Sequence, residues 1–195
     1  MIEKSCGKNL KYSFTDIDSE KKLRNLILYV ANQCINDPTF GKTKLNKILY
    51  FADFKKFKES GKPISGAEYY KDQFGPVPKI INALQQEMVA EGDIIIKSQQ
   101  GIDHDRHKII AINDPDLSGY SVEDISIIDE FIRLFWGKTA TEVSNMSHGK
   151  AWHIVDYYES IPYETAYVSD EPITEDDIEA TNKMASEYDW SHVYA

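Results

Sequence analysis

The hydrophobic pattern of the chain is clearest over residues 42–57, where it predicts a helix. Apolar residues recur there at positions i, i+3, i+4 and i+7, which is the spacing of one helical face. These residues are Leu45, Ile48, Leu49 and Ala52, and four aromatic residues widen the face: Tyr50, Phe51, Phe54 and Phe57. A helix with so wide an apolar surface must be covered on more than one side. We therefore expect a central core helix, capped at Thr43 and ended by Gly61.

The same helical spacing recurs on both sides of this segment. It predicts one helix over residues 18–36 and another that runs to about residue 91. The Gly-Pro-Val-Pro sequence at residues 75–78 indicates a stiff elbow that opens the second of these helices at a proline. Two capping boxes predict further helices that begin at Ser121 and Thr139, because each has an acidic residue three positions later.

Strand signals lie among these helices. Residues 67–74 are a short, aromatic stretch, which favours a strand or an extended segment. Isoleucine-rich stretches at residues 94–96 and 109–112 flank a polar loop at residues 99–106, which predicts a hairpin. The order helix, helix, strand, helix, hairpin is typical of a winged-helix module.

Together these elements predict an α+β, mainly α-helical fold in a single domain over residues 1–195. Its winged-helix-like core with the β-hairpin would occupy about residues 18–166. A C-terminal helical extension follows, an acidic helix at about residues 174–190. That segment has six carboxylates against Lys183 alone, so it could dock on the body, keep the chain soluble or steer a basic partner.

Composition and charge narrow the class of protein. The chain is 42% apolar, has no apolar run long enough to span a membrane, and starts without the apolar region of a secretory signal. Only two cysteines are present, which indicates reduced thiols in the cytoplasm. The net charge is −10, and residues 121–195 hold 16 Asp and Glu against 4 Lys and Arg. Such a chain is not broadly attracted to phosphate backbones, and it favours a basic protein partner or simply solubility.

Two patterns bear on nucleotide and metal binding. The Gly-Lys-Thr sequence at residues 41–43 precedes a helix, but a phosphate-binding loop needs a glycine where this chain has Asn36. His104 and His107 are three residues apart beside two aspartates, which is conceivable for zinc and equally typical of an exposed hairpin loop. We expect no cofactor and no metal.

Hydrolase and DNA-binding chemistry are also weakly supported. A triad could be drawn from the serines near His148 and from Asp156, but no Gly-x-Ser-x-Gly elbow is present, so we expect no catalytic residue. The helix that would read DNA has Lys79 against Glu87 and Glu91, which is not the dense positive face that phosphate contacts require.

Residues 43–52, Thr-Lys-Leu-Asn-Lys-Ile-Leu-Tyr-Phe-Ala, resemble the Lys-Leu-x-Lys-Leu-Leu-Tyr-Phe-Ala signature of the Panacea domain. This is the SocA-like antitoxin family, which is also found among phage-associated proteins. Three further blocks agree with the family in order. They are the turn Gly61-Lys62-Pro63-Ile64, the elbow Phe74-Gly75-Pro76-Val77, and a C-terminal block with Ser147-His148, Trp152 and Ile161-Pro162-Tyr163. The resemblance extends over about residues 26–166.

The resemblance implies an antitoxin that neutralises a cognate, co-encoded protein toxin by direct binding, in a family not known for enzymes. We expect seven residues of these blocks to gather around one surface groove or one shared core seam and to bind the partner. They are Lys47, Tyr50, Phe74, Gly75, Pro76, His148 and Trp152. The simpler alternative is that they only pack the central helix against the C-terminal block. The alternative function is a winged-helix DNA-binding transcriptional regulator, so DNA is a possible but not a favoured partner.

Overall fold

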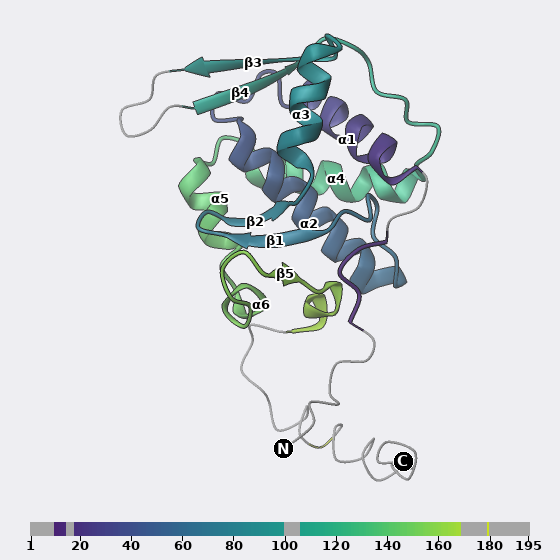
Figure 1. Cartoon of the computed structure of the whole chain (residues 1–195), viewed down its shortest axis with the longest axis vertical. Coiled ribbons are helices and arrows are strands. Elements are labelled where there is room, and N and C mark those ends of the chain that lie inside the picture. Colours follow the sequence, from purple (N-terminus) through teal and green to yellow (C-terminus); the bar gives the residue numbers. More distant parts are fainter. Residues whose placement is uncertain (1–9, 15–17, 100–105, 169–178, 180–195) are drawn as a thin grey trace.

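The computed structural model of the chain describes residues 10–14, 18–99, 106–168 and 179 (Figure 1). It confirms an α+β fold in which helices predominate over small antiparallel sheets. The helices are α1 (Ser19–Gln33), α2 (Lys42–Ser60), α3 (Ile81–Ala90), α4 (Val122–Phe135), α5 (Ala140–Met146), α6 (Lys150–His153) and the 3-10 helix η1 (Tyr163–Tyr167). The strands are β1 (Tyr69–Asp72), β2 (Gly75–Pro78), β3 (Ile94–Gln99), β4 (Arg106–Ala111) and β5 (Ser160–Ile161). The acidic helix predicted at about residues 174–190 lies outside the described residues, apart from Glu179.

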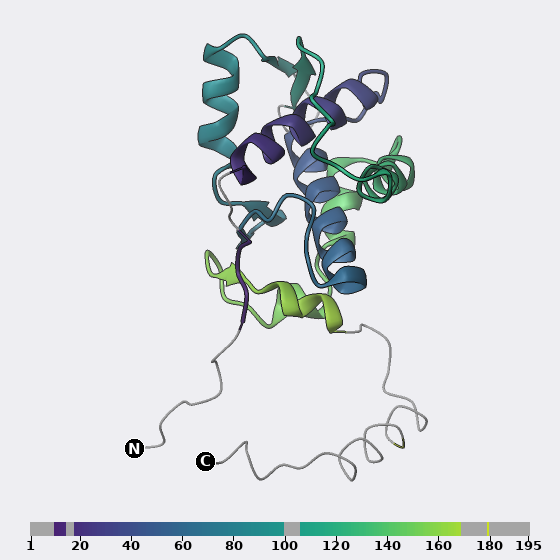
Figure 2. The ribbon, with the colours of Figure 1, turned by 90° about the vertical axis from the view of Figure 1, so that its right-hand side faces the viewer.

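Helix α2 is the centre of the fold, as the hydrophobic pattern predicts. It contacts α1, α4, α5, β2, β4 and η1, so its wide apolar surface is covered on several sides (Figures 1 and 2). Gly61 ends it in the left-handed conformation, with φ of +75°, which confirms that prediction. The Thr43 cap is wrong, because the helix begins at Lys42 and Gly41 is its N-cap. None of the described helices is both long and apolar enough to cross a membrane.

The segment predicted as an elbow is instead the edge strand of a sheet with the order β2-β1-β5. Strand β2 pairs antiparallel with β1, and Asp72 lies opposite Gly75 across a two-residue turn. A strand with two prolines is tolerated here because a proline without an N–H can sit on an edge strand. Helix α3 therefore starts at Ile81 rather than at the prolines.

The hairpin of β3 and β4 is confirmed, with Ile94 paired to Ala111 and Gln99 paired to Arg106. The loop with His104 lies outside the described residues. His107 is exposed on β4, and its Nδ1 lies 3.0 Å from the Ser98 hydroxyl. Within the described ranges, no group of three His, Cys, Asp or Glu residues is arranged to hold a metal ion.

A buried carboxylate, Asp53 on α2, holds the turn that follows this helix. It accepts hydrogen bonds from the backbone N–H groups of Ile64 and Ser65, at 2.9 and 2.7 Å, and from the Tyr69 hydroxyl at 2.7 Å. The Tyr163 hydroxyl, in the C-terminal block, donates to the Ala67 carbonyl close by. Burial raises the pKa of Asp53 despite these donors. The network fixes the turn after α2 and holds the C-terminal block against it.

Both predicted capping boxes are present. The Ser121 hydroxyl accepts from the backbone N–H of Asp124 at the start of α4, and the Thr139 hydroxyl accepts from that of Glu142 at the start of α5. In each box the acidic side chain accepts from the backbone N–H of the cap residue.

We expect Thr139→Ala to lower the free energy of unfolding by about 1 kcal/mol, because a donor at the start of α5 loses its acceptor. The matched control is Thr141→Ala, an exposed position inside the same helix, which should change stability by less than about 0.5 kcal/mol. Urea unfolding followed by circular dichroism would measure both, and equal losses would show that the cap does not stabilise α5.

Candidate functional site

A buried lysine on α2 marks the candidate site. Lys47 is 1% exposed, and its ammonium group donates to the Pro76 carbonyl on β2 at 2.9 Å. Burial lowers the pKa of Lys47 to about 7, against the opposing attraction of Asp72. Burying a positive charge lowers the stability of the folded chain, so a buried lysine is an unusual residue for joining a strand to a helix.

Gly75 is the point at which three segments of the chain meet. Its φ is +93°, and a Cβ built on it would lie 2.7 Å from Lys47 Cε and closer still to the Ser147 hydroxyl. The Ser144 hydroxyl donates to the neighbouring Phe74 carbonyl at 2.7 Å, and the Ser147 hydroxyl donates to the Ser144 carbonyl at 2.6 Å. Only glycine fits here, because any side chain would both strain the backbone and displace its neighbours.

His148 and Trp152 continue the same contact region beyond α5. Their rings are stacked, with centroids 4.1 Å apart. The ammonium group of Lys71 on β1 lies 4.0 Å from the centre of the Trp152 ring, a cation–π contact. The pKa of His148 is lowered by burial, and further by the positive charges of Lys47, His153 and Lys71. The imidazole is therefore held in its neutral form more strongly than a free histidine.

The structure brings five of the seven predicted residues into one mostly buried contact region, which we call the seam: Lys47, Gly75, Pro76, His148 and Trp152. The seam joins α2, the β1–β2 hairpin and the segment from α5 to α6. It is a shared core seam rather than an open groove, since Lys47 and Trp152 are 1% and 8% exposed.

The other two predicted residues lie at the borders of the seam. Tyr50 is one helical turn beyond Lys47, and it is buried. The Phe74 backbone is held by Ser144, while its side chain is half exposed. Among the seven, Phe74 therefore presents the most accessible large apolar side chain.

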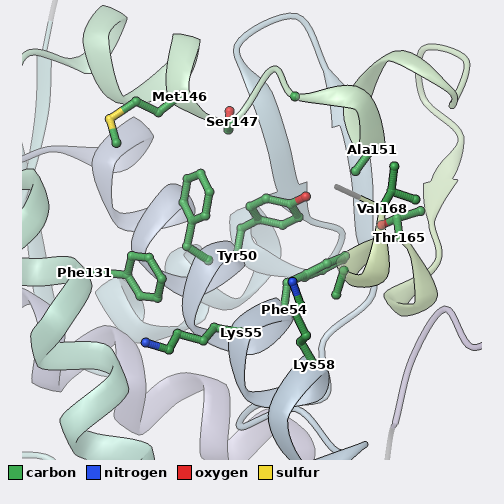
Figure 3. Close-up of a pocket in the computed structure, with 13 residues that line it drawn as sticks. Tyr50, Phe54, Lys55, Lys58, Phe131, Met146, Ser147, Ala151, Thr165 and Val168 are labelled. Carbon is green, nitrogen blue, oxygen red and sulfur yellow. The ribbon is translucent and has the colours of Figure 1, made fainter. Parts of the chain in front are cut away.

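Tyr50 also lines a cavity of about 250 Å³ next to the seam (Figure 3). Aromatic rings of α2 and Phe131 of α4 form one side, and the segment around Ser147 and residues of η1 form the other. Lys55 and Lys58 are the basic residues of its lining. Lys55 is already paired with Glu130, at 2.6 Å.

The hydroxyl groups of Ser144 and Ser147, beside the seam, hold segments of the chain together. In the described part of the chain, both serine hydroxyls donate to main-chain carbonyls, and no hydrogen bond joins either of them to an imidazole. Nε2 of His148 and Nε1 of Trp152 are buried with no hydrogen-bond partner among the described residues.

Sequence reasoning missed Lys71, which is 7% exposed and whose ammonium group lies over the Trp152 and Tyr157 rings. Its only signal is alternation, since it lies two residues after the buried Tyr69 on β1 and therefore on the same face of the strand. From the sequence alone, a lysine at such a position is predicted to be exposed to solvent. Only the structure shows the aromatic residues that surround it.

A comparison with known protein families shows what kind of domain has this geometry. The model of the family described as "Antitoxin SocA-like, Panacea domain" matches residues 45–153, more than half of the sequence, so the chain belongs to that family. The match confirms the resemblance and contains all seven predicted residues, whereas the Ile161-Pro162-Tyr163 block lies beyond it. No curated protein and no solved structure matches the chain.

Proposed function

We propose that this protein neutralises a cognate protein toxin by direct protein–protein contact. The observation that carries the proposal is its membership of the SocA-like Panacea family, whose match covers α2 from Leu45 onward, both hairpins and α4 to α6. The proposed role is binding rather than catalysis, and the proposed compartment is the cytoplasm. Cys34 fits a reducing compartment, because it is a free, buried thiol in the described part of the chain.

The seven predicted residues have a division of labour in this proposal. Lys47, Gly75 and Trp152 are too enclosed to touch a partner, so they hold the β1–β2 hairpin and the α5–α6 segment in place. Phe74 is exposed at the tip of that hairpin and is available for contact. A rigidly held aromatic side chain suits an interface, because little conformational entropy is lost when it is buried.

The alternative proposal is a DNA-binding regulator with a winged-helix-like core. It ranks lower because the helix that would contact DNA is not positively charged. Helix α3 would enter the DNA groove, yet it has no lysine or arginine. Its Glu87 forms an ion pair with Arg24 on α1, and so does Glu91 directly after the helix. Phosphate contacts need several basic side chains on the docking face, which α3 does not supply.

The neighbouring gene tests the proposal. We expect expression of its product alone to arrest growth of a bacterial host, and co-expression of this chain to restore growth. The two proteins should also co-purify through a tag on either one, because neutralisation is by contact. A harmless neighbour, or restored growth without a complex, would contradict the proposal.

A further inference from the structure

The segment after α6 exposes large apolar side chains within five residues. Ile154, Tyr157 and Tyr158 are 65%, 54% and 75% exposed. The Tyr157 ring lies 5.8 Å from the Trp152 ring of the seam and 6.4 Å from the Tyr158 ring. Single exposed apolar residues are ordinary, but three within five residues, two of them neighbouring tyrosines, are typical of a protein interface.

Lys71 fixes this segment from below. Its ammonium group lies 4.0 Å from the Trp152 ring centre and 4.8 Å from that of Tyr157, and it donates to the Val155 carbonyl at 2.6 Å. Its backbone N–H donates to the Glu159 carbonyl at 3.0 Å, and its carbonyl accepts from the N–H of Tyr158 at 2.9 Å. One buried residue of β1 therefore holds the segment through side chain and backbone, so the exposed side chains are presented on a preorganised support.

The backbone of Tyr158 is itself a sign of constraint. Its φ is +67°, and it is the only non-glycine residue with a positive φ in the described part of the chain. A bulky residue in this conformation is strained and persists only because the surrounding contacts hold it. The hydrogen bond from the Tyr158 backbone N–H to the Lys71 carbonyl holds this conformation, in which the Tyr158 side chain is the most exposed of the three.

The charges beside these side chains indicate what kind of surface they fit. Asp156 and Glu159 are exposed within the same segment, while the positive charge of Lys71 is buried beneath it. In a two-fold dimer formed through this surface, both subunits would contribute the same two acidic residues to the interface. Like charges across an interface are unfavourable, so a partner with basic residues around an apolar patch fits better.

We infer that Ile154, Tyr157 and Tyr158 form the surface on which a basic protein partner docks, and that the seam exists to support it. The inference rests on the proposed function, because the partner in question is the toxin. The surface lies at the end of the body marked by α6 and β5, away from the β3–β4 hairpin (Figure 1). It names contacts that the seven predicted residues do not include.

The decisive variant is Tyr158→Gly, which removes the side chain and also relieves the positive φ. We expect it to keep or raise the melting temperature, since glycine adopts this conformation without strain, while weakening binding at least tenfold. The probe is the purified product of the neighbouring gene, and affinity is measured by isothermal titration calorimetry. Ile154→Ser should weaken binding similarly, whereas Ile112→Ser, equally apolar and 54% exposed after β4, should not. Unchanged affinity for Tyr158→Gly and Ile154→Ser would overturn the inference, and absence of binding by the natural chain would overturn the proposed function instead.

The charge of the partner is tested by Asp156→Lys. We expect slower association at low salt and little change in dissociation, because exposed charges mainly steer the encounter. Faster association would show that the partner is not basic and would overturn the inference. Hydroxyl-radical footprinting adds a check on the free chain, in which both tyrosines should be oxidised readily. Protection in a monomer would mean that the chain covers this surface itself, and protection only in a dimer would mean a self-interface; either result overturns the inference.

Discussion

Replacing Gly75 with alanine is expected to lower the free energy of unfolding by about 3 kcal/mol. Two effects add at this position. A left-handed backbone costs a residue with a Cβ about 1–2 kcal/mol, and crowding a packed contact costs about 1–3 kcal/mol. The Cβ would reach both Lys47 and Ser147, so the loss should spread to the whole seam rather than stay in the turn.

Two other glycines separate the strain from the crowding. Gly61 has a φ of +75° with open space around its Cα, so Gly61→Ala should cost about 1 kcal/mol from strain alone. Gly119 has neither a positive φ nor a close neighbour, so Gly119→Ala should change stability by less than about 0.5 kcal/mol. Urea unfolding of the three variants gives the comparison. Equal losses for Gly75→Ala and Gly61→Ala would mean that the residues around Gly75 can move to accommodate the added Cβ with little loss of stability.

The elements predicted correctly from sequence are those that depend on residues close together in the chain. Helix α2 follows from its apolar spacing, the caps at Ser121 and Thr139 from a four-residue pattern, and the β3–β4 hairpin from two β-branched runs. Each of these is stabilised largely within its own segment, so the local sequence holds most of the information.

The elements predicted wrongly or missed depend on distant partners. Strand β2 has two prolines, which locally favour a turn, and it becomes a strand because β1 offers hydrogen-bonding groups along one edge. Strand β5 is two residues long and is defined only by its pairing with Tyr69 and Tyr70, some ninety positions earlier. No local pattern specifies such a pairing.

The candidate site was predictable as a set of residues but not as an arrangement. The family motif identifies Lys47 and Trp152, yet a lysine in a helix reads as exposed, and only the structure shows it buried against Pro76. The same holds for Lys44, which is 1% exposed and paired with the equally buried Asp37 at 2.7 Å. The lysines of α2 make this helix look less buried in the sequence than it is. A pattern of apolar and polar residues assigns every lysine to the exposed face.

Lys47→Met is expected to make the protein more stable at pH 6, by about 2 kcal/mol. The folded chain holds the pKa of Lys47 at about 7, whereas an unfolded lysine titrates near 10.4. Below pH 7 the amine is protonated in both states, so the cost of burying the cation is fully present. Methionine fills a similar volume without charge, although the Pro76 carbonyl then lacks its donor, which returns about 1 kcal/mol of the gain.

The lowered pKa of Lys47 also determines how the stability difference between the two proteins changes with pH. Between about pH 7 and pH 10 the unfolded chain keeps a proton that folded Lys47 has lost, so the stability of the natural protein rises with pH by up to about 1.4 kcal/mol per unit. The advantage of Lys47→Met should therefore shrink from pH 6 to pH 9. The exposed Lys58→Met on the same helix is the control and should show no such trend. Thermal unfolding of all three proteins at both pH values would measure it. A Lys47→Met variant less stable than the natural protein at pH 6 would mean that the contacts to Pro76 and Asp72 outweigh burial, and that Lys47 is a stabilising element of the seam.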